Sequence, residues 1–301
     1  MTLNLLSNKT ENTSQAFTLM ELLVVIAVIG LLSSIIFAIT SGTGEQGRIA
    51  KGLYFSQHLH NSLGSWAAGT WSFDENPASH GTIISDLSGW SNNGILYTND
   101  GTANKSVSGV VNNALSLDGV DDYVNAGNPA SLQIADTVAI ESWVYMIAHG
   151  GTIMSWFNNG YTQAGSIFIG SHVALPSNWW AMLGGTVEWT FGTKISNKWV
   201  HLVITLDLNL ENNQLKAYQN GVLVKQTNWT SDIMTRSATR YIGGGGTGNT
   251  WNGQMDEVRI YGQALTSAQV KERYYAGLDK LLTNGLIAEQ EYQQRLLAVS
   301  L

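Results

Sequence analysis

One apolar segment near the N-terminus constrains this chain more than any other feature of its sequence. The eighteen residues from Leu22 to Ile39 read LLVVIAVIGLLSSIIFAI, and three of them are not strongly apolar. With the preceding residues, from Phe17 on, the segment reaches the roughly 20 residues that an α-helix needs to cross a bilayer. It is also too long for the apolar part of a cleavable secretory signal. We therefore predict a membrane-spanning helix over 17–40.

A single charged residue, Glu21, stands at the start of this segment. An ionised carboxylate at membrane depth costs up to a few kcal/mol, so it is functional by default. The alternative is a Glu that sits at headgroup level at the end of the helix. In a bundle of such helices, the carboxylate can be offset by an ammonium group on a neighbouring chain, because the attraction is strong where the dielectric is low.

The residues AFTLMELLVVIAVIGLLSSI, which begin at Ala16, resemble the prepilin signal of type IV pilins and pseudopilins. The resemblance implies that a prepilin peptidase cuts between Ala16 and Phe17 and that Phe17 becomes a methylated N-terminus. Glu21 is then the fifth mature residue and directs assembly by pairing with the free amine of a neighbour. Leaders in that family usually end in Gly and are basic, whereas this one ends in Ala and carries one Lys and one Glu. A simple signal anchor is what remains if processing fails.

The stretch from 41 to 66 connects this helix to the rest of the chain. Gly42, Gly44 and Gly47 weaken a continuous helix at its start. Apolar residues at helical spacing follow, among them Ile49, Leu53, Leu59 and Leu63. We predict a helical connector here, which resembles the outer half of the long pilin helix.

The chain as a whole has the composition of a β-protein, with 32 Gly, 3 Pro and 11 Trp. Short strand-like runs alternate with turns, and no sustained helical period occurs between 70 and 265. Asn220–Gly221 predicts a two-residue hairpin, and Asp118–Gly119 predicts a second one. Asn212 and Asn213 predict a further turn. We expect an antiparallel β-sandwich over 67–276.

Composition also excludes several kinds of chemistry. The absence of Cys rules out disulfides, thiol catalysis and Cys-based zinc sites. A net charge of −7 without a basic patch argues against binding of nucleic acid by the head domain.

Several segments resemble the laminin-G-like, concanavalin-A-like jelly roll, and they occur in the order of that family. They include DLSGWSNNGIL at 86–96, VNNALSLDGVDDYVNAGN at 111–128, KWVHLVITLD at 198–207 and GQMDEVRIYGQALTSAQV at 253–270. The resemblance implies a module that binds sugars or proteins, often with calcium. The stretch 146–197 matches less closely, and we expect a variable ligand rim there.

Candidate binding residues follow from this expectation. Aromatic rings stack on the apolar faces of sugars, and calcium takes several oxygen ligands. Asp74 and Asp256 are candidate calcium ligands, because the resemblance makes their strands neighbours; solvated or hairpin-capping carboxylates are the alternative. Asp121 and Asp122 are interpreted as polar turn residues. The candidate sugar-stacking residues of the rim are Trp156, Tyr161, Trp179, Trp180 and Trp189.

We predict that the chain is not an enzyme. Retaining glycosidases need two carboxylates about 5–5.5 Å apart, which on one strand means positions i and i+2 or i+4. The pairs Asp74–Glu75 and Asp256–Glu257 are adjacent and point to opposite faces, and no G-x-S-x-G elbow occurs. The catalytic residues are therefore expected to be none.

The C-terminal residues 277–301 predict an amphipathic helical pair broken at Asn284–Gly285. It follows a short helix over 265–277, capped by Thr266 or Ser267, for which Gly277 is the expected stop. The pair resembles a SHOCT-type helical hairpin. Its apolar face favours self-association or docking, or else it packs back on the sandwich.

Together these features predict a minor type IV pilin or pseudopilin that presents a lectin-like module for carbohydrate or protein binding and adhesion. The expected partners are the prepilin peptidase, other pilin subunits, the inner membrane and a surface ligand; calcium is the expected cofactor. The head domain is expected outside the cytoplasm, first at the bacterial inner membrane and then on the pilus or cell surface. A structural pseudopilin of a type II secretion or DNA-uptake machine is the alternative, and a membrane-anchored glycan hydrolase is a lesser one. The predicted division is a leader over 1–16, the membrane helix over 17–40, the connector over 41–66, the sandwich over 67–276 and the hairpin over 277–301.

Overall fold

The computed structural model describes residues 64–101, 103–134, 136–157, 167–183, 187–230, 238–244 and 250–300. The predicted leader, the membrane helix and most of the connector lie outside the described residues. None of the helices among the described residues is long and apolar enough to span a bilayer.

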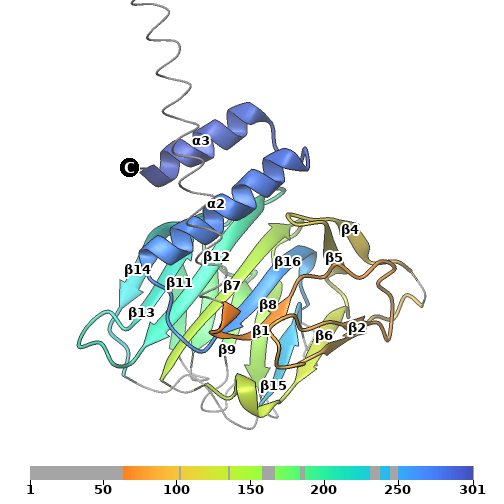
Figure 1. The fold of residues 1–301 in the computed structure, drawn as a ribbon, viewed down its shortest axis with the longest axis horizontal. Coiled ribbons are helices and arrows are strands. Elements are labelled where there is room, and N and C mark those ends of the chain that lie inside the picture. Colours follow the sequence, from red (N-terminus) through yellow and green to blue (C-terminus); the bar gives the residue numbers. More distant parts are fainter. Residues whose placement is uncertain are drawn as a thin grey trace, which may run out of the picture. The chain divides into compact units, whose positions relative to one another are not determined.

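Two eight-stranded antiparallel sheets pack face to face, as the turn and strand pattern predicts (Figure 1). We call them sheet A and sheet B. Sheet A runs in the order β14 (Val222–Thr227), β13 (Leu215–Gln219), β12 (Trp199–Asp207), β7 (Thr137–Met146), β16 (Asn252–Tyr261), β5 (Asn113–Asp118) and β4 (Ser106–Ser108), and β1 (Ala67–Trp71) also pairs with β16. Sheet B runs in the order β11 (Val187–Phe191), β10 (Trp179–Leu183), β9 (Ile167–Ser171), β8 (Gly151–Phe157), β15 (Thr239–Ile242), β6 (Tyr123–Gly127), β3 (Gly94–Tyr97) and β2 (Ile83–Ile84). A short 3-10 helix, η1 (Ala130–Leu132), precedes β7.

Alternation along the strands separates the two faces of sheet A. In β7, Val138, Ile140 and Val144 join the core between the sheets. Glu141 and Trp143 alternate with them and therefore point to the outer face of sheet A. Trp143 is buried there in a second apolar cluster together with side chains of the C-terminal helices. Sheet A is thus covered on both sides along this strand.

The structure confirms the predicted hairpin at Asn220–Gly221 and the predicted turn at Asn212–Asn213, but the second predicted hairpin, at Asp118–Gly119, is wrong. Asn220 and Gly221, with φ of 51° and 78°, join β13 to β14 as a two-residue hairpin, and Asn213 turns the chain between β12 and β13. Asp118–Gly119 makes a turn but no hairpin, because β5 belongs to sheet A and β6 to sheet B. The turn carries the chain from one layer to the other, since β5 finds its partners in β16 and β4.

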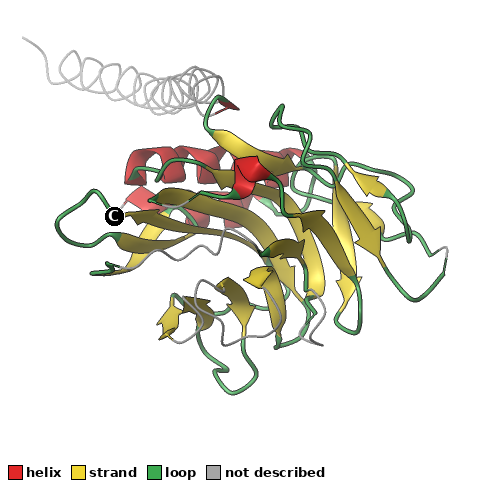
Figure 2. Cartoon of the chain, turned by 90° about the horizontal axis from the view of Figure 1, so that it is seen from below, coloured by secondary structure: helices red, strands yellow, loops and turns green. Residues whose placement is uncertain are grey.

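Two helices cover part of the outer face of sheet A (Figure 2). Helix α2 (Ser267–Thr283) begins with a capping box between Thr266 and Gln269, and α3 (Glu289–Ser300) follows after the Asn284–Gly285 turn. The helical pair therefore packs back on the sandwich, through a cluster that includes Trp143, Trp199, Tyr274, Leu278 and Leu281.

The expected stop at Gly277 is wrong, because α2 continues through it to Thr283. A Cβ atom at Gly277 would lie 2.6 Å from Cε2 and 2.7 Å from Nε1 of Trp143. The glycine thus allows α2 to approach the indole ring closely, and packing rather than capping explains the residue.

Candidate functional site

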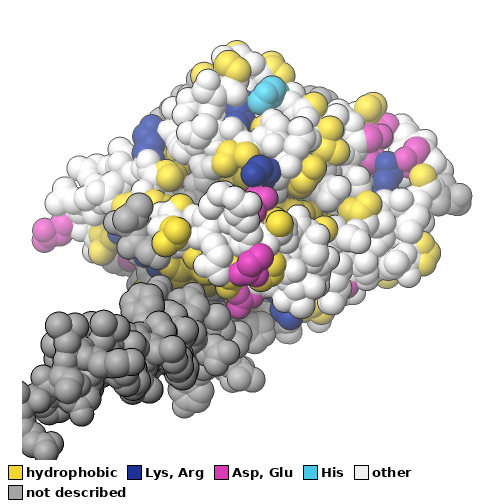
Figure 3. Space-filling model, turned by 90° about the horizontal axis from the view of Figure 1, so that it is seen from above, with side chains coloured by type: hydrophobic (Ala, Val, Ile, Leu, Met, Phe, Trp, Pro, Cys, Tyr) yellow, Lys and Arg dark blue, Asp and Glu magenta, His cyan; other side chains and the backbone are white. Residues whose placement is uncertain are grey.

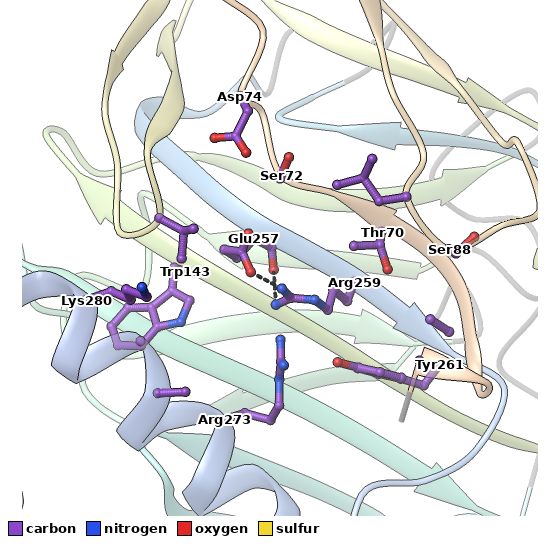
Figure 4. Close-up of a pocket in the computed structure, with 16 residues that line it drawn as sticks. Thr70, Ser72, Asp74, Ser88, Trp143, Glu257, Arg259, Tyr261, Arg273 and Lys280 are labelled. Carbon is purple, nitrogen blue, oxygen red and sulfur yellow. Dashed lines mark hydrogen bonds and ion pairs between the residues drawn. The ribbon is translucent and has the colours of Figure 1, made fainter. Parts of the chain in front are cut away.

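A groove of about 920 Å³ lies on the outer face of sheet A. It lies beside α2, and β1, β16 and the loops at 72–74 and 87–88 supply its other walls (Figure 4). Hydroxyl groups of Thr70, Ser72 and Ser88 line one part of it. The rest of the lining combines apolar or aromatic residues, among them Leu87, Val111, Trp143 and Tyr261, with charged side chains, namely Asp74, Glu257, Arg259, Arg273 and Lys280.

A bulge in β16 brings several of these side chains to one face. The register with β7 shifts between Asp256 and Arg259, and Glu257 has a φ of 54°. The extra residue re-aims the strand, so that Glu257, Arg259 and Tyr261 all line the groove. Strict alternation from Asp256 would have sent Arg259 to the opposite face.

A buried carboxylate, Glu141, binds several groups of the groove floor. Its Oε1 accepts a hydrogen bond from Arg273 Nε at 3.1 Å and lies 3.1 Å from His201 Nε2. Its Oε2 accepts from Tyr261 Oη at 2.7 Å and from Arg273 Nε at 3.2 Å. Arg259 Nη1 lies 3.6 Å from Oε1. Strands β7, β12 and β16 and helix α2 are therefore joined at one point.

Burial and the neighbouring charges shift the pKa values of Glu141 and His201. Burial alone would raise the pKa of Glu141, but Arg273 and Arg259 hold it well below its usual range. Burial lowers the pKa of His201, whereas the Glu141 carboxylate opposes this. At neutral pH, Glu141 is therefore ionised and His201 is neutral.

The two candidate calcium ligands both hold the turn that precedes β5. Asp256 Oδ2 accepts from the Val111 amide at 2.9 Å, and Asp74 Oδ1 accepts from the Asn113 amide at 3.1 Å. Burial raises the pKa of Asp256 well above its usual range, and the nearby Asp74 charge adds to this effect. Asp256 Oδ1 is buried without a hydrogen-bond partner among the described residues. The structure thus brings the pair together and leaves one buried oxygen that a cation could use.

The turn after β5 holds another group of carboxylates. Ligand oxygens of Asp118, Asp121 and Asp122 lie within 4.8 Å of one another. Asp122 is buried, accepts from the Asp118 amide at 3.0 Å and lies 2.7 Å from Lys105 Nζ. The Lys105 ammonium therefore already lies beside Asp122, which agrees with the interpretation of Asp122 as a polar residue of the turn.

Four of the five candidate sugar-stacking residues are buried. Trp156 and Trp179 are 0% exposed, Trp189 is 5% exposed, and all three belong to the core between the sheets. Trp180 is 9% exposed and packs beside His172, with 5.3 Å between ring centroids. The first three rings fill the sandwich rather than form a rim, and Trp180, on the other face of β10, is largely covered as well. Tyr161 lies outside the described residues.

Apart from Asp74, the groove residues are not singled out by the sequence pattern. In sequence, Glu141 is an isolated carboxylate and His201 is one residue of a predicted strand. A usable signal exists nevertheless. Glu141 and His201 each interrupt a largely apolar strand, Arg259 stands between Val258 and Ile260, and buried ionisable groups are rare unless they are paired.

Comparison with known families identifies both parts of the chain. A model described as the concanavalin A-like lectin/glucanases superfamily matches residues 118–271, about half of the chain. The prokaryotic N-terminal methylation motif matches residues 12–37. The chain belongs to the concanavalin A-like lectin/glucanases superfamily, and it joins such a domain to a pilin-type N-terminal segment. This combination is that of a pilin-like surface protein.

Solved structures agree on the fold. Domain 4 of AbnA, a GH43 extracellular arabinanase from Geobacillus stearothermophilus, solved with arabinotriose, is 22% identical; the match covers 68% of this chain and 97% of that one, with a TM-score of 0.51. The binding domain of Paraclostridial Mosquitocidal Protein 1 is 17% identical, with 72% and 53% covered and a TM-score of 0.52. Trypanosoma rangeli sialidase is 14% identical, with 77% and 39% covered and a TM-score of 0.51. The match thus spans only about half or less of the latter two chains. No curated protein matches significantly.

The prediction that the chain is not an enzyme is overturned by these matches, because a domain of an arabinanase and a sialidase are among them. The prediction relied on carboxylate spacing along single strands. In the folded chain, carboxylates that are distant in sequence approach each other, as Asp74 and Asp256 do at the turn before β5. Spacing within one strand therefore excludes no pair formed between strands.

Proposed function

We propose that this chain is a minor pilin-like subunit whose lectin-like head binds a carbohydrate ligand in the groove beside α2. Processing before Phe17 leaves the apolar helix as membrane anchor and assembly element, and the head carries the ligand site. The groove supports the proposal, because a cavity of about 920 Å³ with hydroxyl and charged walls has the size and chemistry to bind sugars. The arabinotriose complex of the arabinanase domain is an example of a sugar ligand on this fold.

Filling the groove tests this proposal. Thr70 lines the groove and is half-buried, so Thr70→Trp would place an indole in the ligand volume. We expect the full-length chain in detergent micelles to bind members of a glycan array, and Thr70→Trp to weaken that binding by about tenfold, or 1.4 kcal/mol. Analysis of the glycans after incubation shows in the same experiment whether any of them is cleaved.

Thr239→Trp serves as the matched control, because Thr239 is also a half-buried strand residue but lies in sheet B. It should bind glycans as the parent does. Equal binding by the parent and Thr70→Trp would show that the groove is not the site. If no glycan binds at all, the alternative of a structural pseudopilin gains support.

Calcium is the cofactor that we propose for the Asp74–Asp256 pair. Asp256 Oδ1 is buried and unpartnered, and burial together with the Asp74 charge raises the pKa of Asp256. A cation bound to both carboxylates would stabilise the ionised form of Asp256 that these two effects disfavour. At a hundredfold excess over its Kd, calcium should stabilise the folded chain by about 2.7 kcal/mol, measured as a rise in Tm.

Asp74→Asn should lose most of this stabilisation, because it removes one charged ligand. Asp136→Asn, at an exposed carboxylate elsewhere, should keep it. Equal calcium-dependent shifts in both variants would place the ion elsewhere or show it to be absent from this pair.

A further inference from the structure

The guanidinium group of Arg273 is only partly used by the protein. Arg273 Nε donates to both oxygens of Glu141, at 3.1 and 3.2 Å. Its Nη1 and Nη2 atoms have no hydrogen-bond partner among the described residues, although Arg273 lines the groove. Figure 4 shows this side chain pointing from α2 toward Arg259. Glu141 thus fixes the guanidinium group in place, while its two terminal nitrogens, Nη1 and Nη2, stay available to a ligand.

Positive charge concentrates at this part of the groove. Arg259 forms an ion pair with Glu257, and its Nη1 lies 3.6 Å from Glu141 Oε1. Burial and then the neighbouring Arg273 charge lower the pKa of Arg259, as expected for two guanidinium groups that both lie beside Glu141. An anion bound to Arg273 would oppose this effect of its charge.

Lys280 adds a further cation to the same wall. It follows Arg273 on α2, is exposed and lines the groove. Its ammonium has no ion-pair partner within the part of the chain that the structure describes. Arg259 and Arg273 are balanced by Glu141 and Glu257, with which they form ion pairs. The charge of Lys280 is therefore in excess on this side, and Asp74 is the remaining carboxylate among the residues that line the groove.

The opposite part of the groove is suited to neutral groups. Thr70 and Ser72 carry hydroxyls that can donate to and accept from sugar hydroxyls. The Ser88 hydroxyl donates to Asp86 Oδ2 at 2.8 Å and can therefore serve a ligand only as an acceptor. The acidic Asp74 lies apart from Arg273 in Figure 4, on the far side of Glu257 and Arg259. A ligand with one anionic group and several hydroxyls would match both parts.

We propose that the groove binds an acidic glycan, in which a sugar carboxylate accepts two hydrogen bonds from Nη1 and Nη2 of Arg273. A guanidinium fork fits a carboxylate in this bidentate manner, and such charge-assisted bonds are stronger than neutral ones. Lys280 attracts the anion over a longer range, and the hydroxyl wall holds the ring. This inference rests on the proposed function, since it names the ligand class of the same groove.

The test compares a trisaccharide of galacturonic acid with the neutral trisaccharide of galactose. Binding of each to the full-length chain in detergent micelles is measured by calorimetry. We expect the acidic probe to bind at least about tenfold more tightly, which is what one charged hydrogen-bond pair contributes. The acidic probe should also lose affinity as salt rises, whereas the neutral one should not.

Arg273→Lys keeps a cation for Glu141 but removes the fork, so it should weaken binding of the acidic probe by about tenfold more than binding of the neutral probe. Lys280→Gln should weaken the acidic probe by about threefold and reduce its salt dependence. Lys216→Gln, on β13 outside the groove, is the matched control and should change neither. Tryptophan fluorescence checks that each variant is folded, and Lys280→Gln carries the test if Arg273→Lys does not fold.

The outcomes separate this inference from the proposed function. If the neutral probe binds as tightly as the acidic one, or if neither groove variant alters the preference, the acidic ligand class is wrong while sugar binding stands. If neither probe binds and the glycan array is also negative, the proposed function itself fails.

Discussion

At the scale of single residues, Glu141 decides how the outer face of sheet A is organised. It is 0% exposed, and its oxygens contact Arg273, His201 and Tyr261. Removing the charge would leave the Arg273 guanidinium without its carboxylate partner in a largely buried place. Glu141→Gln should therefore lower the free energy of unfolding by about 3–5 kcal/mol, measured by urea denaturation followed by tryptophan fluorescence. Glu211→Gln, at an exposed turn carboxylate, is the control and should change it by less than about 0.5 kcal/mol.

The same residues predict how stability depends on pH. The pKa of Glu141 is lowered in the folded chain, so its contribution is full above the usual Glu value of about 4.5 and is lost as pH falls below it. The pKa of His201 is also lowered in the folded chain. As pH falls below about 6.5, this histidine therefore takes up its proton in the unfolded chain before it does so in the folded one. Stability should thus decline with acid from about pH 6.5 and more steeply below 4.5. His201→Gln should remove the upper part of this decline, and an unchanged profile would contradict the assignment.

At the scale of elements, the docking of α2 depends on the absence of a side chain at Gly277. In an open helix, Gly→Ala would stabilise by about 1 kcal/mol. Here the added Cβ would lie 2.6 Å from Cε2 of Trp143. Gly277→Ala should instead destabilise the chain by about 1–3 kcal/mol, measured by urea denaturation. Trp143→Phe removes the crowded atoms, so the added methyl group should cost less in that background; equal costs in both backgrounds would rule out the steric explanation.

Element types were predictable where local chemistry decides them. The Asn220–Gly221 hairpin follows from two residues that tolerate positive φ, and the start of α2 follows from the cap at Thr266. The end of α2 was not predictable, because Gly277 is required by close contact with Trp143, which is distant in sequence. The turn at Asp118–Gly119 differs from the predicted hairpin for a related reason. Its residues specify a turn, but strand pairing elsewhere decides which sheet each arm joins.

At the scale of the whole molecule, sequence motifs predicted the two parts of the chain, whereas the site depended on the fold. The methylation motif and the concanavalin A-like domain are both readable from short segments. The groove combines β1, β16 and α2, and the bulge at Glu257 turns Arg259 into it. No local sequence pattern predicts that these three elements lie side by side. The four Trp residues of the variable stretch, which we expected at a ligand rim, are buried for the same reason, since a Trp on a strand packs inward or outward according to register. Figure 3 shows one face of the molecule, on which charged side chains are few and scattered.

The pilin-type segment makes a prediction for the assembled protein. If prepilin peptidase processes the chain, mass spectrometry of the membrane fraction should find a mature N-terminus at a methylated Phe17. Glu21 is then offset by the free amine of a neighbouring subunit, an attraction that is strong at low dielectric. Glu21→Ala should therefore be processed normally but enter filaments or pseudopilus complexes at least about tenfold less, measured by quantifying the chain in sheared or purified assemblies. Glu45→Ala, beyond the apolar segment, should assemble as the parent does. Normal incorporation of Glu21→Ala would mean that apolar packing alone sets the register of these helices.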